Sequence, residues 1–160
     1  MTLSWLFESL HWLGTTIYCG SVLGFALVLG LAPRLERVDE VAAMDIYRAW
    51  GAILGLAMGT LILGGLGAWY LQHGQSFRWP LDSVADQLSV AKHLVFLVLW
   101  VSSFHLEIWT LDPIRKLQAE GGISDRAAWD RTYGRVVSQL TVNAVLILVV
   151  AGLAVAAAQG

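Results

Sequence analysis

Four long apolar stretches run along the chain, at about residues 3–32, 50–71, 90–111 and 136–158, with shorter polar stretches between them. An α-helix needs roughly 20 predominantly apolar residues to cross a hydrocarbon core about 30 Å thick, and each stretch reaches that length. Backbone polar groups must be satisfied within the segment inside lipid, so these stretches are expected to be helices. The pattern predicts an all-α integral membrane protein with four transmembrane helices.

Helix-ending and helix-starting residues set the expected boundaries. Pro33 is expected to close the first helix and Pro113 to follow the third, while Ser83 is a candidate N-cap for the third and Ser124 for a long fourth helix. The first stretch lacks a basic leading region and is longer than a cleavable signal peptide, so we expect it to be retained. No internal repeat is found, and residues 1–160 are predicted to form a single four-helix domain.

The connections differ in their basic residues. The first and third connections are rich in arginine and lysine, whereas the second offers only Arg78 and Lys92. By the positive-inside rule the first and third connections face the cytoplasm, and both termini lie outside. Because short connections make consecutive helices antiparallel neighbours, the sequence predicts an up-down-up-down bundle, N-out and C-out.

Composition agrees with a membrane protein. Hydrophobic residues make up 57% of the chain and charged residues only 14%, against about a quarter in soluble domains. A net charge of −2 gives no indication of nucleic-acid binding, which would need a clustered basic face. The lone cysteine, Cys19, excludes an internal disulfide and a cysteine-rich metal cage.

Two histidines lie at matched positions in the predicted spans. His11 and His93 each stand about ten residues from the expected outer start of helices 1 and 3, which run parallel, so they share roughly the same depth. Ionisable residues inside a membrane are functional by default. Two imidazoles at one depth suit a six-coordinate haem iron, which predicts haem b with His11 and His93 as axial ligands. The alternative is a pair of hydrogen-bonded structural histidines.

Other residues are candidates for the surroundings of a cofactor. His105 lies twelve residues beyond His93, about 18 Å deeper, and Met58 on helix 2 could pair with it at a second haem. The alternative for His105 is a position near the inner interface. Trp100, in the middle of helix 3, is a candidate cofactor contact or a core residue. Tryptophans near the helix ends are expected in interfacial belts, namely Trp5, Trp12, Trp50, Trp69, Trp79 and Trp109.

Helix 2 carries glycines at a spacing of four, Gly51, Gly55 and Gly59. Such a smooth stripe admits either another helix or a flat porphyrin. Glu8, one turn before His11, either accepts a proton from the imidazole or lies in the wet interface. Lys92 is expected to extend toward the membrane surface.

The segment HWLGTTIYCGSVLGFALVLGLAPRLERV resembles the first helix of the copper-resistance D (CopD) family, through His11, Gly20 and the Pro33-Arg34 exit. SVAKHLVFLVLW is similar to the third helix of that family, through Lys92. The same positions resemble HemJ-type protoporphyrinogen oxidases, in which a first-helix histidine binds haem and a third-helix lysine matters to activity. These resemblances imply a four-helix membrane fold and a haem or copper site.

The leading hypothesis is a b-type cytochrome of the bacterial inner membrane. His93 beside Lys92 favours a closed six-coordinate iron, which passes electrons between a quinone or redox protein and an outside acceptor, alone, as a homo-oligomer or as a subunit of a larger complex. The alternatives are copper binding or transport through His11, His93, Met58 and Cys19, a HemJ-like porphyrinogen oxidase, and a structural subunit. Whether the protein is an enzyme stays open at this point.

Overall fold

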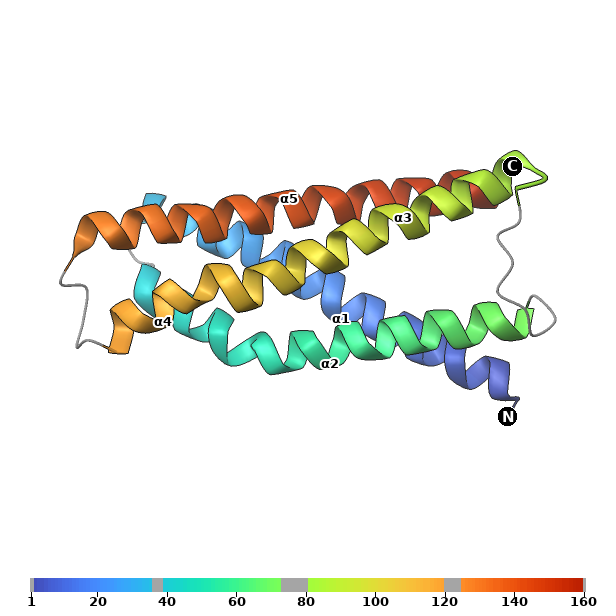
Figure 1. Ribbon diagram of the computed structural model, residues 1–160, viewed down its shortest axis with the longest axis horizontal. Helices are drawn as coiled ribbons and strands as arrows, with labels where there is room; N and C mark the ends of the chain where they lie inside the picture. Colours follow the sequence, from blue (N-terminus) through green and yellow to red (C-terminus); the bar gives the residue numbers. More distant parts are fainter. Residues whose placement is uncertain (1, 36–38, 73–80, 120–124, 160) are drawn as a thin grey trace. The chain divides into compact units, whose positions relative to one another are not determined.

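The computed structural model describes residues 2–35, 39–72, 81–119 and 125–159, which are almost entirely helical (Figure 1). Four helical segments are long and apolar enough to cross a membrane, namely Leu3–Arg34, Glu40–Gln72, Val84–Lys116 and Arg126–Gln159. The prediction of an all-α chain with four apolar helices that could span a membrane is thereby confirmed. The chain packs as two compact units, Met1–Pro80 and Leu81–Gly160, and each is a helical hairpin.

The first unit pairs α1 (Leu3–Leu31) with α2 (Glu40–Gln72). The two helices are antiparallel, because Phe25 lies against Tyr47, with ring centroids 5.0 Å apart, whereas the earlier residue His11 meets the later residue Leu61. A short 3-10 turn, η1 (Ala32–Arg34), contains Pro33 and ends α1 as predicted. α2 begins ten residues before its apolar stretch.

Small residues bring α1 and α2 into backbone contact. A Cβ atom on Gly14 would lie 2.6 Å from the carbonyl oxygen of Ala57, and one on Gly64 would lie 2.7 Å from the carbonyl oxygen of Phe7. Only hydrogen fits at these positions. Because lipid supplies little hydrophobic drive between helices, such close van der Waals contact is a main source of stability within a membrane hairpin.

The second unit packs α5 (Arg126–Gln159) against a helical path made of α3 (Val84–His105), a π-helical turn η2 (Leu106–Thr110) and α4 (Leu111–Ala119). Ser83 caps α3 as predicted: its Oγ accepts from the Asp86 amide at 3.1 Å, and the Asp86 carboxylate accepts from the Ser83 amide at 3.2 Å. This reciprocal capping box satisfies two amides that no helical carbonyl reaches.

The prediction that Pro113 follows the third helix is wrong. The helical path continues through it, and Pro113 is the third residue of α4. Proline lacks an N–H and its ring collides with the carbonyl four residues earlier, which makes it costly in a helix interior. Here the π turn η2 comes directly before α4, so Pro113 falls in a first turn, where an N–H would have no α-helical partner.

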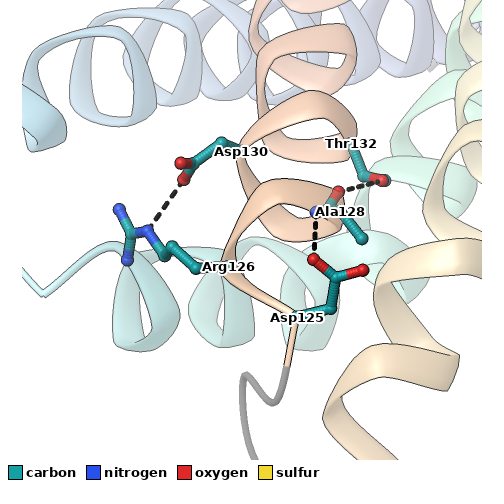
Figure 2. A network of polar contacts seen from close by, with 5 residues as sticks. All are labelled: Asp125, Arg126, Ala128, Asp130 and Thr132. Carbon is teal, nitrogen blue, oxygen red and sulfur yellow. Dashed lines mark hydrogen bonds and ion pairs between the residues drawn. The ribbon is translucent and has the colours of Figure 1, made fainter.

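α5 begins with a side-chain cap (Figure 2). The Asp125 carboxylate accepts from the Ala128 amide at 2.9 Å, and Arg126 pairs with Asp130 at 2.9 Å one turn further on. Asp125 therefore takes the capping role at the start of this helix. Ser124, the predicted start, lies outside the described residues.

Tryptophans divide between the surface and the core of the units. Trp5, Trp12 and Trp109 are exposed on their own units, in keeping with positions near helix ends. Trp129, which the apolar pattern does not single out, is fully buried in the second unit, with its ring 6.0 Å from that of Tyr133. It anchors the first turns of α5.

Candidate functional site

His11 is held by a backbone carbonyl of the neighbouring helix. Its ring is half-buried against α2, and Nδ1 lies 3.0 Å from the carbonyl oxygen of Leu61. A carbonyl oxygen can only accept, so Nδ1 carries the hydrogen and Nε2 carries the lone pair. Within the described part of the chain, this ring makes its hydrogen bond through Nδ1 alone. His11 is therefore in the tautomer that presents Nε2 to a metal.

Two glycines of α2 form a cradle for His11. A Cβ atom on Gly65 would lie 2.9 Å from Nδ1 and 3.2 Å from Cε1 of the imidazole, and one on Gly64 would lie 2.9 Å from the Cα atom of His11. The ring thus lies directly over Gly65, and the backbone of α1 over Gly64. The sequence signal for this cradle is the run Gly64-Gly65-Leu66-Gly67, which does not follow the spacing of four of the predicted glycine stripe.

Gly55 and Gly59 lie elsewhere on α2. A Cβ atom on either would meet nothing within 4 Å among the described residues, so neither packs on α1. Gly55 is exposed and Gly59 half-buried in the first unit. Their stripe is an open, smooth surface, and the predicted contact with a porphyrin or another helix stays a prediction.

His93 also places Nδ1 against a backbone carbonyl, in the second unit. Its ring is half-buried on α3, and Nδ1 lies 2.6 Å from the carbonyl oxygen of Ser89, one turn earlier. The same reasoning places the hydrogen on Nδ1 and the lone pair on Nε2. His11 is the ninth residue of α1 and His93 the tenth of α3, so each stands about 12 to 14 Å along its helix from the start. These helix starts agree with the predicted ones.

His105 lies at the end of α3 in a different setting. Its exposed ring places Nδ1 3.2 Å from Nε2 of Gln139 and 3.5 Å from Oγ1 of Thr110. Gln139 also donates to the Ser102 carbonyl at 2.9 Å and accepts from the Thr110 hydroxyl at 2.9 Å. Three polar side chains and one backbone carbonyl thus join α3 and η2 to α5 within this hairpin.

Asn143 extends this network into the core of the second unit. It is only 1% exposed, accepts from the Ser102 hydroxyl at 2.6 Å, and donates to the Ser103 hydroxyl at 3.2 Å. We call the whole group the polar cluster: Ser102, Ser103, His105, Thr110, Gln139 and Asn143. Sequence reasoning missed Gln139 and Asn143, although two amides four residues apart in an apolar span are the signal that marks them.

The other candidate residues are Met58, Trp100 and Glu8. Met58 is 6% exposed, inside the first unit, which favours a packing role, whereas its suggested partner His105 belongs to the second unit. Trp100 is 40% exposed on α3. Glu8 accepts from Gln72 at 3.4 Å, so the acceptor of the His11 Nδ1 hydrogen is Leu61 and not this carboxylate.

The described residues contain no group of three or more His, Cys, Asp or Glu side chains that could hold a metal ion. A haem iron needs fewer protein ligands than a free metal ion, because the porphyrin supplies four ligands and the protein only the axial ones. The carbonyl-held tautomers of His11 and His93 and the glycine cradle fit that requirement. His73 and Trp79 lie outside the described residues.

Comparison with known protein families, with curated proteins and with solved structures finds no match for this chain. The histidines and their hydrogen bonds therefore carry the inference of function.

Proposed function

We propose that the protein is a membrane-embedded b-type cytochrome that binds haem b between the first and third spans, with His11 and His93 as axial ligands. In this proposal the two hairpins form an up-down-up-down bundle of CopD-like architecture in a bacterial inner membrane. Both termini lie outside, because the arginine-rich first and third connections face the cytoplasm. The protein passes electrons alone, as a homo-oligomer or as part of a larger complex.

The observation that carries the proposal is the matched tautomer of His11 and His93. Each Nδ1 lies within hydrogen-bond distance of a backbone carbonyl, Leu61 in one case and Ser89 in the other. Histidines that ligate metals almost always use their second nitrogen in this way, which fixes the ring and raises the basicity of Nε2. His105 lacks this arrangement, because Gln139 donates to its Nδ1.

The positions of the two histidines along their helices support one shared site. Both stand about 12 to 14 Å from the start of helices that run in the same direction in the proposed bundle. Gly55 and Gly59 offer a smooth open surface on α2, and the exposed face of Trp100 offers an aromatic one on α3. These residues would line the macrocycle, while His11 and His93 hold the iron.

Two axial imidazoles favour electron transfer over an oxidase. When bound, the haem supplies one-electron chemistry at its iron. With both axial positions taken by His11 and His93, no coordination position is left for a substrate. The half-buried rings, each held by a backbone carbonyl, would supply both protein ligands of the iron. We therefore rank this activity above copper handling and above a HemJ-like oxidase.

Optical spectroscopy of the purified protein tests the proposal. Protein from haem-replete cells should show a sharp reduced-minus-oxidised haem spectrum, and His11→Ala and His93→Ala should each remove or broaden it. His73→Ala, a histidine substitution in the second connection, is the matched control and should leave the spectrum unchanged. Colourless wild-type protein, or a spectrum that survives both substitutions, would end the proposal. Metal analysis of the same sample separates iron from copper.

A further inference from the structure

The hydrogen bonds of the polar cluster determine the tautomer of His105. The Ser102 carbonyl can only accept, so it fixes which end of the Gln139 amide is the NH₂ group. The Thr110 hydroxyl donates to the other end, Oε1. The second hydrogen of the Gln139 NH₂ group then points to Nδ1 of His105 at 3.2 Å, which makes Nδ1 an acceptor. The hydrogen of the neutral imidazole is therefore on Nε2.

This Nε2–H group belongs to a ring that is exposed on the surface of the second unit. His105 stands about 18 Å along the helical path from His93 and about 16 Å from Lys116, the last residue of the span. At this depth in a bilayer an N–H group without an acceptor costs free energy, since there is no water to accept its hydrogen. Among the described residues, the ring accepts one hydrogen bond, from Gln139 to Nδ1, and the Thr110 hydroxyl, whose hydrogen goes to Gln139, lies 3.5 Å from the same nitrogen. The site therefore calls for an acceptor from outside the unit.

The π turn holds the ring in place for such an acceptor. η2 begins directly after His105, and its wider turn brings Thr110, five residues later, within reach of both His105 and Gln139. Thr110 and Asn143 are buried, so the cluster behind the ring is anchored in the core of the hairpin. Single π turns inside α-helices occur frequently at functional sites.

We infer that the Nε2–H group of His105 is the hydrogen-bond donor to a carbonyl oxygen of a membrane quinone. Nε2 of His105 does not bind a metal in this tautomer, because it carries a hydrogen atom and has no free lone pair. Inside an apolar span a neutral acceptor costs less free energy than a charged one. The ester carbonyls of phospholipids lie nearer the membrane surface, whereas a quinone ring is neutral, dissolves in the bilayer and carries the carbonyl oxygen that the donor needs.

This inference rests on the proposed function and names the electron donor of the same protein. A quinol that becomes a quinone releases two electrons and two protons. Passed one at a time, the two electrons would reduce two ferric haem irons to ferrous iron, and the two protons would leave to water. The polar cluster serves only to hold the imidazole ring of His105.

Photolabelling tests the quinone site directly. We would place the full-length protein in lipid nanodiscs, add an azido derivative of decylubiquinone, and map the labelled peptides. Labelling should concentrate around residues 100–116 and be suppressed by excess decylubiquinone. His105→Leu should weaken this competed labelling roughly three- to tenfold, the loss expected for one hydrogen bond. His105→Gln, which keeps an N–H donor, should retain most of it, and Phe104→Leu, on the neighbouring exposed side chain, should retain all of it.

Labelling that is equal in His105→Leu and wild type, or that spreads over the exposed faces of all spans without competition, would overturn the quinone site. The same experiment on His11→Ala separates this outcome from failure of the cytochrome proposal. Competed labelling in a protein without haem would support the site while the cytochrome fails. A haem spectrum without His105-dependent labelling would leave the cytochrome and remove the site.

Discussion

Nδ1 of His11 donates to the carbonyl oxygen of Leu61 across the α1–α2 interface, at 3.0 Å, and the Nδ1 and Cε1 atoms of the imidazole lie over Gly65. This contact joins the packing of the hairpin to its proposed chemistry. The glycine permits the close approach, the carbonyl fixes the tautomer, and the tautomer leaves the lone pair on Nε2. A change at Gly65 should therefore act on the ligand before it acts on the fold.

Gly65→Ala should reduce the haem content several-fold. The new Cβ atom would lie 2.9 Å from Nδ1 and 3.2 Å from Cε1, so the imidazole must move and lose its bond to Leu61. Absorbance of haem per mole of purified protein measures the effect. Gly20→Ala is the control, because a Cβ atom there meets nothing within 4 Å and alanine favours a helix. Equal haem content in both variants would show that the cradle does not position His11.

The open stripe on α2 gives a second prediction. Gly59→Leu should lower the haem content at least as much as Gly65→Ala if the stripe faces the macrocycle, since a large side chain would fill that space. The α1–α2 hairpin itself should be unaffected, because nothing in the described first unit lies within 4 Å of the new Cβ atom. Gly152→Leu, also in open space but near the end of α5, is the matched control. Normal haem content in Gly59→Leu would remove Gly59 from the site.

Asn143→Leu should destabilise the second unit by about 1 kcal/mol. The substitution removes the acceptor of the Ser102 hydroxyl and the donor to the Ser103 hydroxyl in a buried part of the span. Hydrogen bonds between membrane helices contribute about 0.6 kcal/mol on average and up to about 1.7. SDS titration in mixed micelles measures the free energy of unfolding. Thr141→Ala, whose hydroxyl bonds only within α5, should change it by less, and an equal loss in both would contradict the interhelical role.

The cap of α5 gives a second prediction about stability. Asp125→Ala removes the acceptor of the Ala128 amide and should cost about 1 kcal/mol, whereas Asp125→Asn keeps an acceptor oxygen and should cost a few tenths. The same titration compares the two variants. If asparagine is as damaging as alanine, the carboxylate charge and not the hydrogen bond is what stabilises this helix start.

Much of the fold was predictable because lipid imposes simple rules on sequence. The four apolar helices, the break at Pro33 and the cap at Ser83 follow from local residue chemistry. The position of Pro113 was predicted wrongly because the π turn just before α4 places this proline in a first turn. Local sequence rules do not predict such a π turn. Local rules describe single helices and do not give such changes of register.

The site was predictable only in part for a related reason. The polar character of His11, His93 and His105 stands out in any apolar stretch, and it marked them as candidates. Their tautomers depend on which group meets Nδ1, and for His11 and His105 that group belongs to another helix. Gln139 and Asn143 were visible as amides in a span, but their joint role with His105 required the register of α3 against α5.

Electron paramagnetic resonance of the oxidised protein tests the central claim most directly, because the signal of ferric haem reports the axial ligands. The account predicts a low-spin ferric signal from one haem per chain in wild-type protein, replaced by a high-spin signal or by loss of haem in both His11→Ala and His93→Ala. A low-spin signal that persists in either variant, or wild-type protein with no haem signal, would contradict it.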